Sequence, residues 1–192
     1  MKSLDPEYLK SSLVISSLFL TGHEMLKGVV VENLKGFICM NSKFNDDGEL
    51  VHIENDDYRE IKSKKHSQFN NQTHEYFSCC EWYAHRSILT SDELSSLQAI
   101  IRHRNRIAHD LPSFLLNDNM NLDIELLFKM QALLTKVRKY WFFEFEALIK
   151  PEFENTTIQE DDVAFPIISY MGFLVDLAQV EIQKLKKSDD AK

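Results

Sequence analysis

The chain has 192 residues, of which 44% are hydrophobic and 27% are charged, a composition that fits one globular core and excludes extended disorder. The formal net charge of −8 argues against a protein that coats nucleic acid non-specifically, although a small basic site on an acidic body remains compatible with it. Only five glycines and four prolines occur, so we expect an all-α protein with a single domain over residues 1–192.

The three cysteines, Cys39, Cys79 and Cys80, lack the spacing of a disulfide framework. Such a set indicates free, buried thiols in a reducing compartment. The apolar stretch 13–20 is shorter than the roughly 18 residues that a membrane span needs. We therefore expect a cytoplasmic protein that does not associate with a membrane.

The first predicted element is helical over about residues 5–40, because its apolar residues recur at helical spacing. Gly22 either bends one long helix or separates two shorter ones. Residues 41–57 are polar and are expected to form a long loop insertion that is suited to contacting a partner. Asp47 and Gly48 form a turn signal within it, which would also suit a short hairpin.

A second helix is expected over about residues 58–89. Its basic tract at 62–66 is either a solvated helix face or a contact to an RNA backbone. A third helix is expected to begin at Thr90, since Thr90 and Glu93 have the spacing of a capping box. It should end shortly before Pro112, because proline disfavours helical backbone in the residue that precedes it.

A fourth helix is expected from a cap at Asn121 to about Ile149. Its apolar residues lie on most of its sides, which predicts a central place in the fold or a dimer interface. A last helix should span about residues 159–187, with Pro166 near its first turns, and the tail 188–192 should fray. Together these elements predict a bundle of four to five helices.

The third helix carries a polar cluster near its end, and residues 102–109 read Arg-His-Arg-Asn-Arg-Ile-Ala-His. On a helical wheel with about 100° per residue, Arg102, Asn105 and His109 share one face. Arg104 instead falls in the middle of the apolar arc. A guanidinium there needs a carboxylate partner, a polar cleft or an interface to offset its loss of hydration.

The residue types in this cluster suit proton transfer at a phosphate. His109 should lie in the last helical turn, where its charge can change near neutral pH. The arginines would stabilise a phosphate and the charge that develops on it. In this interpretation Arg102, Arg106 and His103 bind the substrate, although the wheel places His103 and Arg106 further toward solvent. The alternative is that the cluster is only a solvated helix end.

The segment 104–109, Arg-Asn-Arg-Ile-Ala-His, resembles the Arg-(four to six residues)-His motif of the HEPN superfamily, in which Asn often follows the Arg. The resemblance implies an α-helical bundle and a metal-independent endoribonuclease of toxin–antitoxin or phage-defence (abortive infection) systems, without a cofactor. It implies that Arg104 and His109 are catalytic and that Asn105 positions the phosphate or the other two. It also implies a homodimer with a composite site, an RNA substrate, and an antitoxin or defence-system protein as a partner.

The sequence departs from one branch of this superfamily. Leu111 stands where toxins paired with nucleotidyltransferase antitoxins usually carry a Tyr that is modified. Arg102 also has a compatible spacing to His109, and we prefer Arg104 because Asn105 follows it. A second hypothesis is a non-catalytic HEPN-like helical module that binds a partner or regulates an enzyme.

No metal site is expected. A set of histidines and cysteines lies within the second predicted helix, but its spacing matches no zinc pattern. Its members are His74, Cys79, Cys80 and His85.

Overall fold

A computed structural model describes residues 5–116, 123–153, 158–159 and 163–190, and these residues are mostly helical, which confirms the all-α class. The helices and strands are, in chain order, α1 (Pro6–Cys39), β1 (Ser42–Phe44), β2 (Leu50–His52), α2 (Asp56–Ser63), β3 (Lys65–His66), β4 (Gln72–Thr73), α3 (Glu75–His85), α4 (Ser91–His109), α5 (Leu111–Leu116), α6 (Ile124–Trp141), α7 (Ala147–Ile149) and α8 (Pro166–Asp190). Between these elements lie short 3-10 turns at Ser67–Phe69 and Pro151–Phe153 and a π-helical turn at Phe142–Glu146.

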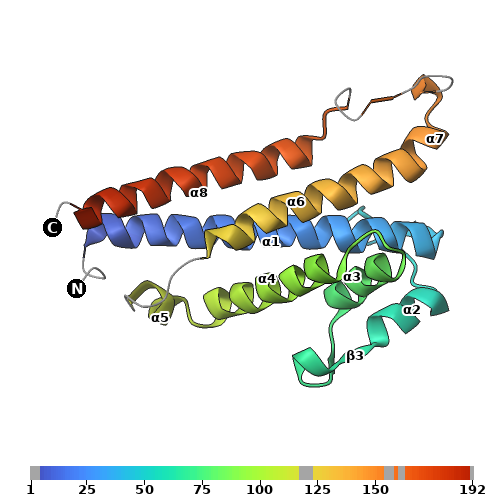
Figure 1. Ribbon diagram of the computed structural model, residues 1–192. Coiled ribbons are helices and arrows are strands. Elements are labelled where there is room, and N and C mark those ends of the chain that lie inside the picture. The colour runs from blue at the N-terminus through green and yellow to red at the C-terminus, as the bar shows by residue number, and fades with distance from the viewer. Residues whose placement is uncertain (1–4, 117–122, 154–157, 160–162, 191–192) are drawn as a thin grey trace.

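Helix α1 is the central element, and α3, α4, α6 and α8 all pack against it (Figure 1). The side chain of Asp5 caps its first turn by accepting a hydrogen bond from the backbone N–H of Glu7 at 3.0 Å. The helix continues through Gly22, so the alternative of two helices is wrong. A side chain at Gly22 would lie only 3.1 Å from the Met171 methyl group and 3.2 Å from Leu127. The glycine thus permits close approach of α6 and α8.

Helix α6 packs along the central helix α1, and the predicted alternative of a dimer interface stays a prediction. Its buried residues face α1, α4 and α8, and they are Leu126, Leu127, Met130, Leu133, Leu134, Val137 and Trp141. A buried polar link joins it to α1 and α3, because the Tyr83 hydroxyl donates to the Val30 carbonyl at 3.0 Å and accepts from Trp141 Nε1 at 2.7 Å. This link fixes the register of three helices.

The segment between α1 and α3 contains two small hairpins. Residues 41–57 include the antiparallel hairpin β1–β2, the alternative that the turn signal at Asp47 and Gly48 suits, with Gly48 at φ 79° in its turn. The expected helix over 58–89 is wrong as a single element, because residues 64–74 form a small β3–β4 hairpin between α2 and α3. Asn70 and Asn71 adopt left-handed backbone at φ 54° and 57°, which no helix accommodates.

The other helix ends are close to those expected. The capping box of α4 is present, with Glu93 N–H donating to Thr90 Oγ1 at 3.2 Å, and α4 ends at His109. Residues 111–116 form the unexpected helix α5, in which Pro112 lies in the first turn, where its missing N–H has little cost.

The last two long helices begin later than predicted. Helix α6 begins after a cap at Asp123, whereas the predicted cap Asn121 lies outside the described residues. Helix α8 begins at Pro166 rather than near residue 159, because proline suits a first turn better than a helix interior. It continues through Asp190, and residues 191–192 lie outside the described part, so the expectation that the tail frays from residue 188 stays a prediction.

Helix α1 is long and apolar enough to cross a membrane by length and composition alone. Half of its most apolar window is buried inside the bundle, and the central helix of a helical core has the same composition. The three cysteines are free and buried, as predicted.

Candidate functional site

Helix α4 presents a basic strip on its outer side, which we define as Arg102, Asn105, Arg106 and His109. Arg102, Arg106 and His109 are exposed and Asn105 is half-buried, so the shared face that the helical wheel predicts for Arg102, Asn105 and His109 agrees with their exposure. Among the described residues, no carboxylate forms an ion pair with Arg102, Arg106 or His109. On a protein with net charge −8, this strip is an accessible surface for an anion.

Arg104 lies beside the strip in a cleft, and its side chain is 33% exposed. Its Nη2 donates to Glu24 Oε1 of α1 at 3.1 Å, and its Nη1 donates to Asn105 Oδ1 at 3.4 Å. The prediction that this arginine needs a carboxylate or a polar cleft is confirmed, since it has both. Glu24 is half exposed, so the ion pair is well screened by solvent.

The cleft, which we call the polar cleft, lies between α1, α3 and α4 and has a volume of about 120 Å³. Its lining consists of one apolar side chain and seven polar ones, namely Ile101 and His23, Glu24, Lys27, His74, Tyr76, Arg104 and Asn105. Helix α1 contributes three of these residues, which are more than 70 positions before Arg104 in the sequence. No pattern within α4 alone could therefore have identified them.

Three buried polar atoms of the polar cleft have no hydrogen-bond partner among the described residues: His23 Nε2, the Tyr76 hydroxyl and Arg104 Nε. Burial lowers the pKa of His23 from 6.5 to about 4, although Glu24 beside it acts in the opposite direction. Burial also raises the pKa of Tyr76 well above its usual value. At neutral pH the imidazole is thus uncharged and the phenol keeps its proton.

The tautomer of His23 follows from its neighbour. Its Nδ1 lies 3.2 Å from Glu24 Oε1, and an ionised carboxylate can only accept, so Nδ1 carries the hydrogen. His23 Nε2 is therefore a bare acceptor, whereas the Tyr76 hydroxyl and Arg104 Nε–H are donors. The cleft combines both kinds of hydrogen-bonding group within one small volume.

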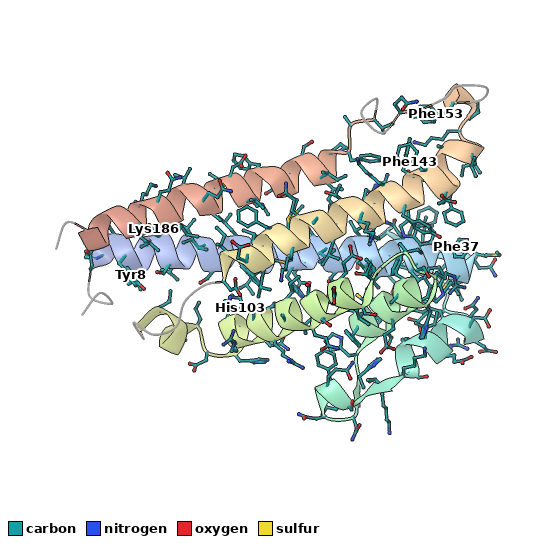
Figure 2. All side chains as sticks on the ribbon, viewed as in Figure 1. Tyr8, Phe37, His103, Phe143, Phe153 and Lys186 are labelled. Atoms are coloured by element: carbon teal, nitrogen blue, oxygen red, sulfur yellow. The ribbon has the colours of Figure 1, made fainter. Side chains whose placement is uncertain are left out.

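His103 is buried, with 1% of its surface exposed, so its expected position toward solvent is wrong. It lies on α4 near the start of α6 (Figure 2). Arg106 approaches its Nδ1 at 2.9 Å, and the backbone N–H of Asp123 donates to its Nε2 at 3.3 Å. Burial and the charge of Arg106 both lower the pKa of His103. Its ring packs edge-on against Phe19 of α1, which makes it a structural link between α4, α1 and the start of α6.

A serine–histidine–carboxylate arrangement occurs at the β3–α3 junction. His66 Nε2 lies 2.8 Å from Ser78 Oγ, and His66 Nδ1 lies 3.4 Å from Glu81 Oε1. These distances suit an activated nucleophile. However, Ser78 is fully buried and also hydrogen-bonds to the backbone carbonyl of His74, so no substrate reaches its hydroxyl. The arrangement holds β3 against α3.

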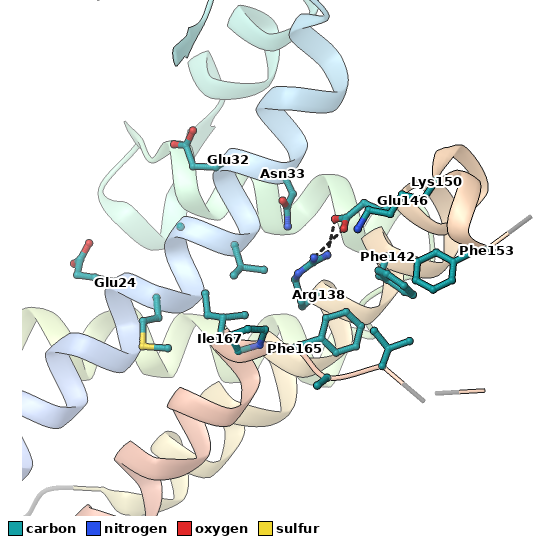
Figure 3. Close-up of a pocket in the computed structure, with 16 residues that line it drawn as sticks. Glu24, Glu32, Asn33, Arg138, Phe142, Glu146, Lys150, Phe153, Phe165 and Ile167 are labelled. Carbon is teal, nitrogen blue, oxygen red and sulfur yellow. Dashed lines mark hydrogen bonds and ion pairs between the residues drawn. The ribbon is translucent and has the colours of Figure 1, made fainter. Parts of the chain in front are cut away.

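A larger cavity of about 790 Å³ lies between α1, the π-helical turn and the start of α8. Figure 3 shows Arg138 joined to Glu146 there, with the rings of Phe142 and Phe165 beside the pair. The two nitrogens of Arg138 lie 2.6 and 2.9 Å from the carboxylate oxygens, so the charge of Arg138 is already neutralised. Sequence reasoning missed this cavity, because its lining comes from segments that are far apart in the sequence.

Among the described residues, no three His, Cys, Asp or Glu side chains come together as a metal site requires. Comparisons with protein-family models, characterised proteins and solved structures found no match for this chain. The basic strip and the polar cleft therefore have to be interpreted from their own chemistry.

Proposed function

We propose that this protein is a metal-independent endoribonuclease of HEPN type that acts in a toxin–antitoxin or phage-defence system. The observation that supports the proposal is the basic strip of α4, which carries two exposed arginines without a carboxylate partner among the described residues, and the exposed His109, beside a cleft that holds Arg104 and Asn105. Its cationic groups are those needed to bind an RNA phosphate.

The reaction would be transesterification within RNA. His109 accepts the proton of a 2′-hydroxyl, whose oxygen attacks the adjacent phosphorus, and the bond from phosphorus to the 5′-oxygen breaks. A proton returned to that oxygen completes the step and leaves a 2′,3′-cyclic phosphate and a 5′-hydroxyl. Arg104 stabilises the charge on the phosphate, and Asn105, whose Oδ1 accepts from Arg104, positions the guanidinium. Arg102 and Arg106 hold the neighbouring phosphates.

The composite site of a homodimer is part of this proposal. His109 is exposed and makes no hydrogen bond to another described residue, whereas Arg104 reaches into the polar cleft. One protomer thus does not join the two groups by itself. Two copies with their basic strips facing one another would bring Arg104 and His109 of each protomer to one RNA strand. The proposed setting is the cytoplasm, with an antitoxin or defence-system protein as a regulator.

The test is cleavage of labelled RNA in the presence of EDTA, with the termini of the products identified by mass. We expect cyclic phosphate ends, and a loss of about 10²–10⁴-fold in rate in His109→Ala. His85→Ala is the matched control, because His85 is also an exposed histidine in the last turn of a helix. Undiminished cleavage by purified His109→Ala protein would refute the assignment. Arg102→Gln and Arg104→Gln, compared in the same assay, identify the leading arginine, and we expect the larger loss for Arg104.

A second candidate function is a non-catalytic HEPN-like module that binds a partner protein. The β1–β2 hairpin supports it, because Phe44 and Leu50 face each other across the strands and are 72% and 60% exposed. Met40 at the base of the hairpin is 86% exposed. Paired exposed apolar residues of this kind mark contact surfaces. Folded protein that is inert toward RNA and loses a stable complex in Phe44→Ser would favour this candidate.

A further inference from the structure

We propose that the polar cleft binds one unpaired base of the RNA substrate and that Tyr76 and His23 determine which base is preferred. The inference rests on the proposed function, to which it adds a specificity pocket. It concerns residues of α1 and α3, which lie outside the motif in α4.

The unmet hydrogen-bonding groups of the cleft point to a ligand. Tyr76 is 2% exposed and His23 is 4% exposed, yet the Tyr76 hydroxyl and His23 Nε2 have no partner among the described residues. Arg104 Nε, which lines the same cleft from a third helix, is also unpartnered. Buried polar groups are almost always hydrogen-bonded, so three unpartnered ones on residues that line one cavity are unusual.

The pattern of donors and acceptors selects the class of ligand. His23 Nε2 is an acceptor, because its Nδ1 donates to Glu24, whereas the Tyr76 hydroxyl and Arg104 Nε–H are donors. A phosphate offers only acceptor oxygens, and these would be repelled by the lone pair of His23 Nε2. The edge of a nucleobase presents donors and acceptors side by side, which matches the cleft.

The size and the position of the cleft agree with this assignment. A bridging water needs about 10–15 Å³ of such space, so a volume of about 120 Å³ exceeds the requirement of a single water. The rings of His23, His74 and Tyr76 contribute to the lining, and aromatic rings are the usual partners of unstacked RNA bases. Asn105, at the margin of the cleft, precedes His109 by one turn, about 6 Å along the helix axis. A base in the cleft would therefore leave its phosphate near the basic strip.

The matched variants are Tyr76→Phe and Tyr83→Phe. Each removes one buried hydroxyl, but the Tyr83 hydroxyl has two partners in the core and the Tyr76 hydroxyl has none. Loss of an unpartnered hydroxyl should leave the melting temperature unchanged or raise it, whereas loss of a bonded one should lower it. If the Tyr76 hydroxyl had only a structural role, Tyr76→Phe should lower the melting temperature.

The experiment measures binding of single-stranded RNAs made of adenine, cytosine, guanine or uracil alone to the His109→Ala protein, which leaves them intact. We expect one base to bind about tenfold more tightly than the others, the discrimination of one well-placed pair of hydrogen bonds. Adding Tyr76→Phe should abolish this preference, and adding Tyr83→Phe should retain it. Equal binding of the four RNAs, no binding, or the same loss of preference in both variants overturns the inference. Wild-type cleavage is measured separately, so a protein that discriminates bases without cutting RNA refutes the proposed function and not the pocket.

Discussion

Replacing His23 by glutamine should flatten the pH dependence of stability on the acid side of neutrality. The folded protein holds His23 uncharged, because burial lowers its pKa from 6.5 to about 4. Above pH 6.5 the imidazole is neutral in both states and its contribution to stability is complete. As the pH falls toward 4, the unfolded chain takes up a proton that the folded chain does not, and stability is lost. The full difference corresponds to about 3 kcal/mol.

Urea denaturation between about pH 7.5 and about pH 4.5, followed by tryptophan fluorescence, measures this loss. Burial also lowers the pKa of His74 and His103. These two histidines therefore also reduce the stability of the folded protein as the pH falls, and they do so in both the wild-type and the His23→Gln protein. The difference between the wild-type and His23→Gln curves therefore isolates His23. The pKa of the Glu24 carboxyl is itself lowered, so its contribution is lost only in more acid solution, at the end of this range. Parallel curves for the two proteins would show that His23 is not held neutral in the folded state.

Three further variants test the packing of the bundle by urea denaturation. Tyr83→Phe leaves the buried indole N–H of Trp141 without its acceptor, and we expect it to lower the free energy of unfolding by about 2–4 kcal/mol. Gly22→Ala places a methyl group 3.1 Å from the end of Met171 and should cost about 1–3 kcal/mol. Gly28→Ala meets nothing within 4 Å on the same helix and should instead stabilise by about 0.5–1 kcal/mol. Equal signs for the two glycine variants would contradict the close approach at Gly22.

The helices could be predicted where local chemistry decides them. The period of apolar residues and the capping box of Thr90 depend on neighbours within one turn, so α1 and α4 have nearly their expected extents. The break at residues 64–74 could not be predicted in this way. His66 there is buried against Ser78, and tertiary packing of this kind overrides the helical preference of the flanking residues.

The candidate site also has features that local sequence predicts and features that depend on distant residues. The helical wheel correctly placed Arg102, Asn105 and His109 on one side of α4, and it identified Arg104 as an arginine in need of a partner. It could not name Glu24, which lies 80 residues earlier in the chain. It also failed for His103, because α4 packs against α1, α3 and α6 at once and its buried arc is wider than the one that was assumed.

The composite nature of the site can be tested by mixing two inactive proteins. In one protomer, Arg104 reaches into the polar cleft toward Glu24, whereas His109 is exposed at the end of α4. If each site takes its arginine from one protomer and its histidine from the other, Arg104→Gln and His109→Ala proteins should complement each other. Random exchange would produce heterodimers in about half of the population, each with one intact site of two, and thus about a quarter of wild-type cleavage. If both groups acted within the same protomer, every site in the mixture would lack one of them. Mixing would then restore no activity, and the dimeric site would have to be abandoned even if His109 proved essential.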